Sequence, residues 1–286
     1  MQKALDFFKG RTAVIANKHK KEQVIGRLLE QHLGLKIIVT EVIDTDKFGT
    51  FTRDIERKGT QLEAARAKAD EGMRLTGAEI GIASEGSFGP HPILGFVATN
   101  VEIVVLVDKK YDLEIMGGIV SLKTNYNQRD VRNVEEAVSF ATGIGFPSHG
   151  IIIRTHPGKG LEMEKGVTTV EQLEQAVIKF LKISPIGKVF LETDVRAFAN
   201  PTRMENIRLA TEDLVKNALG VCPQCSIPGF SVTQKKRGLP CEMCGSETDS
   251  TLADVYICKK CGFTKDEFYP EGKKVAYAGN CNYCNP

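Results

Sequence analysis

All eight cysteines of the 286-residue chain lie after residue 220, where they form four Cys-x-x-Cys pairs. The pairs are Cys222/Cys225, Cys241/Cys244, Cys258/Cys261 and Cys281/Cys284. Each pair offers two thiolates from one tight turn, so two pairs complete a tetrahedral four-cysteine site and four pairs complete two. Zinc closes such sites without redox chemistry and leaves no coordination position for water. The sequence therefore predicts two structural zinc ions.

Disulfides are the alternative use of these cysteines, and the compartment decides between the two. The chain has no stretch of about 18 uninterrupted apolar residues, which a transmembrane helix requires. The segment Met1–Lys9 contains an acid and no long apolar core, unlike a signal peptide. We therefore expect a cytoplasmic protein with no membrane partner, in which thiols stay reduced and bind metal. A catalytic redox role is disfavoured because nothing thioredoxin-like surrounds any pair.

Spacing alone leaves open which pairs share an ion. Residues 241–261 resemble a self-contained zinc ribbon, with a glycine after each knuckle and the strand-like Val255–Ile257 between the knuckles. This slightly favours a nested arrangement, in which the two outer pairs share the second ion. A sequential arrangement, first pair with second and third with fourth, is nearly as plausible.

The chain changes character at about residue 220. Residues 221–286 are rich in Gly, Pro, Cys and Lys and lack periodic apolar positions, so this zinc-binding module needs metal to hold its fold. Residues 1–220 alternate β-branched runs with amphipathic stretches, which predicts an α/β domain with a mixed sheet and covering helices. We expect strands at 11–16, 35–42, 78–83, 101–107, 113–120, 150–154 and 188–192, and helices at 24–33, 60–75, after Asn133, at 169–182 and at 203–219.

Positive charge gathers where the first of these strands ends. Asn17 is suited to cap the following helix, whose first turn would then hold Lys18, His19, Lys20 and Lys21. Cations there oppose the helix macrodipole, each at about 0.3–1 kcal/mol. An anion bound by Asn17, Lys18 and Lys20 explains this arrangement. A solvated run of charges whose repulsion is screened by salt explains it equally well.

Two glutamates are candidates for catalysis. Glu85 follows an apolar strand in a turn of small residues, where a carboxylate can hold magnesium or activate water. Glu63 lies at the start of a helix, but Thr60-x-x-Glu63 is also a capping box, and on its own capping is the favoured interpretation.

Two arginines near the last helix are candidates to hold a phosphate or a carboxylate. Arg196 follows Asp194, which could instead neutralise it. Thr202-x-x-Glu205 predicts a capping box and so places Arg203 at the start of the helix. A structural ion-pair cluster is the alternative for these side chains.

Three motifs follow one another along residues 1–90: Asn-x-x-Lys after the first strand, Thr-x-x-Glu-x-Ala-x-x-Lys-Ala on a helix, and a strand that leads to an acidic, glycine-containing turn. Together they resemble the pyrophosphatases of non-standard purine nucleoside triphosphates, which are similar to the inosine triphosphatases. The resemblance implies an α/β sheet around a long cleft and magnesium-dependent release of pyrophosphate. It places Asn17 and Lys20 at the triphosphate, matches Glu63 and Lys68 to the helix motif, and makes Arg203 the base-contacting arginine.

The chain also departs from that family's pattern. The family carries two adjacent aspartates at the acidic turn, whereas Ser84-Glu85 supplies one carboxylate. Ala64 stands in place of an asparagine, and residues 143–147 echo a later Gly-Phe-Gly-Tyr-Asp-Pro loop without its aspartate. The whole chain resembles, in addition, an uncharacterised microbial zinc-ribbon-containing family of unknown function, through Phe88-Gly-Pro-His-Pro92, Asn200-Pro-Thr-Arg-Met204 and Cys281-Asn-Tyr-Cys-Asn-Pro286.

Two functions from different classes follow. The first is a magnesium-dependent nucleoside triphosphate pyrophosphatase, or a nucleotide-binding protein, that takes a small phosphate-bearing ligand. The alternative is a non-enzymatic zinc-ribbon protein that binds nucleic acid or a protein partner. Lys235–Arg237 and Lys273–Lys274, near aromatic residues such as Tyr277, are candidate nucleic-acid contacts, while a net charge of +2 argues against non-specific coating.

Overall fold

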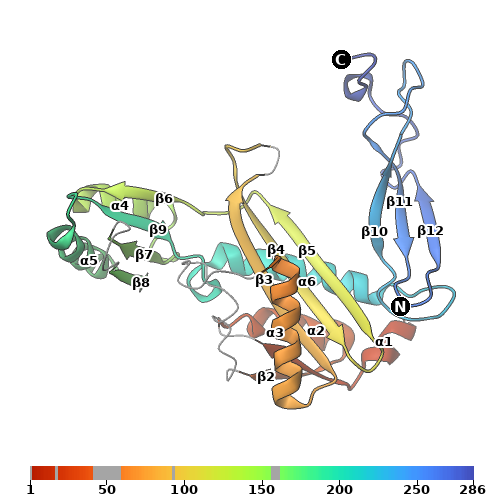
Figure 1. Ribbon diagram of the computed structural model, residues 1–286, viewed down its shortest axis with the longest axis horizontal. Helices are drawn as coiled ribbons and strands as arrows, with labels where there is room; N and C mark the ends of the chain where they lie inside the picture. The colour runs from red at the N-terminus through yellow and green to blue at the C-terminus, as the bar shows by residue number, and fades with distance from the viewer. Residues whose placement is uncertain (1, 17–18, 41–58, 92–93, 156–161) are drawn as a thin grey trace.

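The computed structural model describes residues 2–16, 19–40, 59–91, 94–155 and 162–286. These residues contain a five-stranded, a four-stranded and a three-stranded sheet. The five-stranded sheet lies between the other two (Figure 1). Within these ranges, none of the helices combines the length and the apolar character that crossing a bilayer requires.

The five-stranded sheet is mixed, as the sequence predicts. Its strands are β1 (Thr12–Ala16), β2 (Lys36–Thr40), β3 (Ile80–Pro90), β4 (Ala98–Asp108) and β5 (Leu113–Ser121), in the order β2-β1-β3-β4-β5. Parallel pairing joins β1 to β2 and to β3, whereas β3, β4 and β5 form an antiparallel meander. The parallel strands β1, β2 and β3 therefore need crossover connections, whereas β3, β4 and β5 can be joined by turns.

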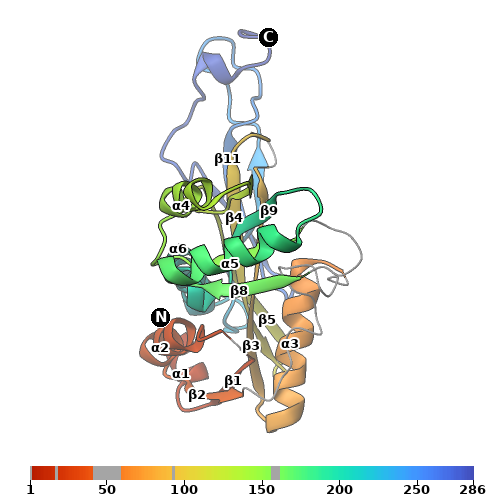
Figure 2. The same cartoon turned by 90° about the vertical axis from the view of Figure 1, so that its left-hand side faces the viewer.

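Helices cover both faces of this sheet. One face packs against α1 (Gln2–Phe8), α2 (Glu22–Leu33) and α6 (Pro201–Leu219), where the buried apolar residues form the largest core cluster. The other face packs against α3 (Gln61–Thr76), whose small side chains meet Ala83 and Val105. Figure 2 shows α3 on the opposite side of the long strands from α1 and α2. This arrangement confirms the α/β class with a helix-covered mixed sheet.

The remaining α/β elements form a second, antiparallel sheet. It contains β6 (Gln128–Val131), β7 (Ile151–Arg154), β8 (Met163–Val167) and β9 (Val189–Thr193) in the order β6-β9-β7-β8. Two helices, α4 (Val134–Gly143) and α5 (Val170–Ile183), close a separate core on this sheet. The sequence treats residues 1–220 as one sheet, and the structure divides them between two. Alternation of strands and helices reveals that apolar faces exist, but not which faces pack together.

The strands β1 and β3 differ in length, and the difference leaves a step in the sheet. The last registered pair between them is Ile15 with Ile82, whereas β3 runs on to Pro90 beside β4. The predicted turn at Ser84 is therefore wrong, because pairing with β4 supplies backbone hydrogen bonds throughout this Gly- and Ser-containing stretch. From Ser84 onward, β3 is therefore no longer paired with β1, and we call this place the step.

The outer edge of β5 is covered by α6. Gly117 allows the closest approach, because a Cβ atom there would meet the backbone of Ala210 and Leu214. On either side of it, the Gly118 N–H donates to Asp213 Oδ2 at 3.0 Å, and Asn217 Nδ2 donates to the Met116 carbonyl at 2.8 Å. Side chains of α6 thus satisfy backbone groups of an edge strand, which are otherwise open to pairing with another chain.

The cysteine-rich segment forms the third sheet. Its strands β10 (Val232–Arg237), β11 (Thr251–Ile257) and β12 (Thr264–Phe268) make an antiparallel meander in the order β10-β11-β12. The segment extends away from the five-stranded sheet, with the C-terminus at its far end (Figures 1 and 2).

We expect Gly117→Ala to destabilise the protein, because the added methyl group has to displace α6 from β5. Overpacking of this kind costs about 1–3 kcal/mol in the free energy of unfolding, measured by urea denaturation. Gly143→Ala is the matched control, since a Cβ atom there meets nothing within 4 Å and alanine is the better helix former. Equal stability of the Gly117 variant and the wild type would contradict the close approach.

Candidate metal centres and a buried charge cluster

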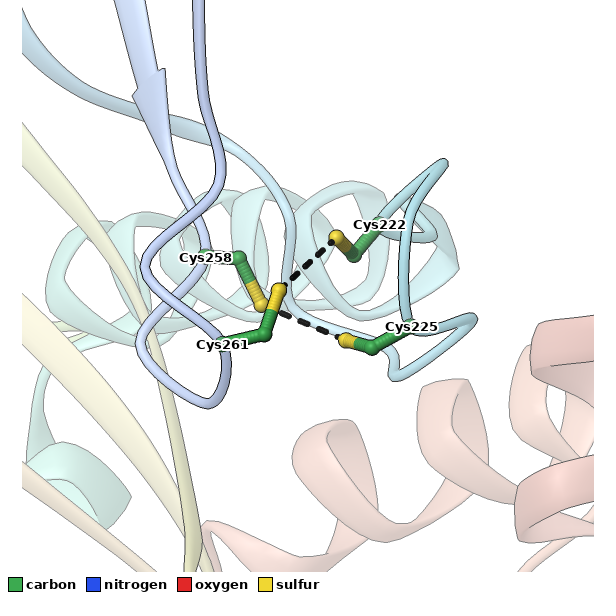
Figure 3. A group of neighbouring side chains, drawn as sticks. All are labelled: Cys222, Cys225, Cys258 and Cys261. Carbon is green, nitrogen blue, oxygen red and sulfur yellow. Dashed lines mark hydrogen bonds between the residues drawn. The ribbon is translucent and has the colours of Figure 1, made fainter.

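The eight cysteines form two groups of four. Within each group, the four sulfur atoms all lie within 4.8 Å of one another. The proximal site consists of Cys222, Cys225, Cys258 and Cys261, and the distal site consists of Cys241, Cys244, Cys281 and Cys284. Figure 3 shows the proximal site, in which the knuckle that follows α6 faces the knuckle between β11 and β12.

The sulfur–sulfur distances fit a tetrahedral metal site. They are 3.7 Å for Cys222–Cys261 and 3.6 Å for Cys225–Cys258 in the proximal site. In the distal site, Cys241–Cys284 is 3.9 Å and Cys244–Cys281 is 3.7 Å. An ion bound to four thiolates at about 2.3 Å holds them about 3.8 Å apart, whereas a disulfide needs about 2.0 Å. The eight thiols are free, and both groups can hold a metal ion.

The pairing of the knuckles differs from both expectations. The first pair joins the third and the second joins the fourth, which is neither nested nor sequential. The three antiparallel strands explain this, because each strand carries the chain from one end of the sheet to the other. A strand of about seven residues spans roughly 20 Å, so knuckles that are consecutive in the chain stand at opposite ends.

The proximal site packs against the five-stranded sheet. Ile227, next to the first knuckle, joins the core cluster beneath α6. From the third knuckle, Lys260 Nζ donates to the Tyr111 carbonyl at 3.1 Å, and Lys259 pairs with Glu114 at 3.6 Å. The proximal site therefore joins the module to the β4–β5 turn, whereas the distal site stands at the far end of the module.

Hydrogen bonding divides the thiols of the distal site into easily and reluctantly ionised groups. Bonds from the hydroxyl and the backbone N–H of Ser246 lower the pKa of Cys244 to about 6. Hydrogen bonding with Cys244 raises the pKa of Cys284 to about 12. The Cys244 thiol thus ionises readily, whereas ionisation of Cys284 is opposed. A cation that binds all four must displace the remaining protons, so binding becomes weaker as the pH falls.

Two lysines meet β3 where β1 ends. Lys21 Nζ contacts Ser84 Oγ at 3.0 Å and the Ser84 carbonyl at 3.4 Å, while Lys68 forms an ion pair with Glu85. Consecutive side chains of a strand point to opposite faces, so Lys21 approaches from the α2 side and Lys68 from the α3 side. Lys21, Ser84 and Glu85 are all buried.

Arg203 lies in the interior of the protein. Its Nε donates to Glu102 at 2.8 Å, its Nη1 donates to the Val195 carbonyl at 2.7 Å, and its side chain is 1% exposed. The predicted capping residue Thr202 is wrong, because α6 is capped by Asn200, whose Oδ1 accepts from the Arg203 N–H. A helix that begins at Pro201 with this cap places Arg203 in its first turn, as expected. The geometry gives Arg203 a buried ion pair rather than a surface position.

The other predicted residues lie apart from this cluster. Glu63 forms both hydrogen bonds of the capping box with Thr60, which lower the pKa of its carboxyl group. Arg196 pairs with Asp194 at 2.6 Å and stacks on Phe198. Each of these side chains therefore has a structural role.

The stretch that follows β1 is only partly described. Asn17 and Lys18 lie outside the described residues. The predicted cap at Asn17 is nevertheless wrong, because α2 begins at Glu22 with Lys21 in the N-cap position. Lys20 lines an open depression of about 370 Å³ between α2 and α6, together with Gln23, Val24, Ala197, Phe198, Pro201, Met204, Glu205 and Arg208. Lys68, Glu85 and Arg203 do not line this depression.

Lys21 and Glu102 are members of the cluster that sequence reasoning missed. Burial and the nearby Arg203 lower the pKa of Lys21 to about 7, although Glu85 and Glu102 act in the opposite direction. Nothing in the sequence separates Lys21 from the lysines beside it. Glu102 did leave a signal, because it is a lone acid inside an apolar strand, and such an acid is buried only with a partner.

The chain belongs to the family described as "Domain of unknown function (DUF6671)", whose model matches residues 68–286. The match begins at Lys68 and includes Glu85, Arg203 and all eight cysteines. A search of the curated proteins found no match. Membership of an uncharacterised family with paired cysteines is therefore confirmed, whereas the resemblance to inosine triphosphatases stays a prediction.

We expect Cys225→Ser and Cys244→Ser each to lower the metal content from two ions per chain to one, because each removes a ligand from a different site. Only the proximal variant should weaken the five-stranded sheet, by more than about 2 kcal/mol, since Ile227 and Lys260 depend on that site. Elemental analysis gives the metal content, and hydrogen exchange of the β5 amides reports the sheet. Equal protection of β5 in the two variants would contradict this division of roles.

Proposed function

We propose that each four-cysteine site binds one structural zinc ion. The donor set supports this, because four thiolates about 3.7 Å apart complete a tetrahedron and leave no position for a substrate. The proximal ion would then fix the module to the β4–β5 turn, and the distal ion would close the far end of a sheet that has little apolar core of its own.

We further propose that the α/β part binds the phosphates of a nucleotide at the step where β1 ends. The observation that carries this proposal is the convergence of Lys21 and Lys68 on Ser84 and Glu85. Two ammonium groups on adjacent strand residues suit a phosphate chain, because phosphate oxygens accept hydrogen bonds and carry the opposite charge. Lys20 precedes Lys21 in the chain and lines the depression between α2 and α6, from which it adds a third positive charge.

The reaction that fits this site is attack of water on a phosphoryl group, with release of pyrophosphate from a non-standard purine nucleoside triphosphate. In this proposal, Lys68 and Lys20 neutralise the phosphates, and Glu85 orients the water. Arg203 holds Glu102 directly beneath Gly86, where a side chain larger than hydrogen would collide with both. We therefore assign Arg203 a positioning role rather than a contact with the base.

We expect the purified protein to release pyrophosphate from a panel of purine triphosphates that includes those of inosine and xanthosine, assayed both with magnesium and with a chelator. Glu85→Gln should lose most of this rate, at least about 100-fold, because it keeps the shape and removes the charge. Glu174→Gln, on the exposed face of α5, is the matched control. Release at the no-protein background over the whole panel would exclude this reaction.

The second candidate function is binding of a partner protein by the distal end of the module. Met243, Tyr277 and Tyr283 are largely exposed there. The basic segment on β10 is less suited to nucleic acid than its sequence indicates. Each of its cations faces a carboxylate, with Lys235 paired to Asp254, Lys236 to Asp266 and Arg237 to Asp249.

We therefore expect a fluorescently labelled single-stranded oligonucleotide to bind only weakly to the full chain. The measurement is fluorescence anisotropy at about 50 and 200 mM salt, since phosphate contacts make binding salt-dependent. Micromolar binding that weakens steeply over this range would instead favour a nucleic-acid partner for residues 221–286.

A further inference from the structure

Among the described residues, the donor atoms beside the end of β1 do not fit the magnesium ion that the resemblance to the inosine triphosphatases implies. Magnesium prefers about six oxygen ligands, including one or two carboxylates, in near-octahedral geometry. Here Ser84 stands in place of one of the family's two aspartates. The remaining carboxylate, Glu85, already pairs with Lys68, and the Ser84 hydroxyl already contacts Lys21 at 3.0 Å. Ammonium groups occupy the oxygens that a divalent ion would need.

We infer that the Lys21 ammonium group takes the role of the divalent cation, so that the site binds a polyphosphate chain without magnesium. This inference rests on the proposed nucleotide-binding function of the same site. Lys21 reaches the step from the N-terminal end of α2, is 8% exposed, and lies against the one hydroxyl that replaces a carboxylate. A hydroxyl where a carboxylate could stand, and a buried lysine beside it, both make the local charge more positive.

The charges of the described residues around the step favour an anion. Lys21, Lys68 and Arg203 carry three positive charges, against two negative charges on Glu85 and Glu102, so the cluster has a net charge of +1 when Lys21 is protonated. In a buried environment such an excess is weakly screened. It repels a free divalent cation and attracts a phosphate chain.

The same charges make binding depend on pH. Lys21 contacts Ser84 on β3, and its protonation is also influenced by the charges of Glu85 on β3, Glu102 on β4, Lys68 on α3 and Arg203 on α6. Burial and the two cations favour its neutral form, whereas a bound phosphate favours its ammonium form. Above neutral pH the free protein has to take up a proton when the anion binds. The affinity for polyphosphate should therefore fall as the pH rises from about 6.5 to 8.5.

The experiment is calorimetric titration of the full chain, in its metal-loaded form, with inorganic tripolyphosphate. Exchange into chelator immediately before titration keeps magnesium out, and elemental analysis verifies that the cysteine-bound metal remains. We expect binding in chelator that weakens about 10-fold between pH 6.5 and 8.5. Lys21→Met should weaken binding at pH 6.5 by 10-fold or more, whereas Lys182→Met, an exposed lysine of α5, should not change it.

The variant Lys21→Arg tests whether the positive charge at this position, rather than a change in the fold, controls binding. Arginine stays protonated over this range, so this variant should bind in chelator with no decrease between pH 6.5 and 8.5. Binding by the wild type only when magnesium is added would overturn the inference and leave the nucleotide site intact. Unchanged affinity in a folded Lys21→Met variant would also overturn it. Failure of the wild type to bind with or without magnesium would overturn the proposed nucleotide function itself.

Discussion

The difference in length between β1 and β3 is the constraint on which the α/β part depends. β1 pairs with β3 only as far as Ile82, so within the described residues most of the eleven-residue β3 has no strand neighbour on that side. Side chains from α2 and α3 fill the step, and Gln61 at the start of α3 donates to the carbonyls of Glu85 and Val101. Buried polar groups require partners, and the charged side chains buried at the step find them in one another.

Several features could be predicted because a single residue type or a local pattern determines them. Two cysteines at a spacing of three bring two sulfur atoms together within one turn, and Thr60 with Glu63 makes a capping box that needs no tertiary contact. The remainder depends on pairing across long distances in the chain. The division into two sheets, the continuation of β3 past Ser84 and the burial of Lys21 all follow from which strand lies beside which. Periodicity along one segment carries no information about that choice.

The two ion pairs at the step, Glu102–Arg203 and Glu85–Lys68, join different elements of the fold. Glu102 and Arg203 come from β4 and α6, so their ion pair joins the sheet to the helix that covers β5. Breaking one partner of such a pair leaves a buried charge without compensation, which is far more destabilising than losing both. The pair of Lys68 and Glu85 joins α3 to β3 instead, and Lys68 is the more exposed of the two cations, at 12% of its side chain against 1% for Arg203. The proposed phosphate ligand would therefore compete for hydrogen bonds there without separating β4 from α6.

The crossed order of the four knuckles has a consequence for synthesis of the chain on the ribosome. The first two knuckles emerge before the third, and together they already offer four thiolates to any ion in the cell. Only β10 keeps Cys222 and Cys241 at opposite ends of the module, and β10 has no partner until β11 has also emerged. Nascent chains that capture metal early would close the wrong loop and would have to release the ion before the sheet could form. Delivery of metal after translation, or rapid exchange of the ion between knuckles, avoids this trap.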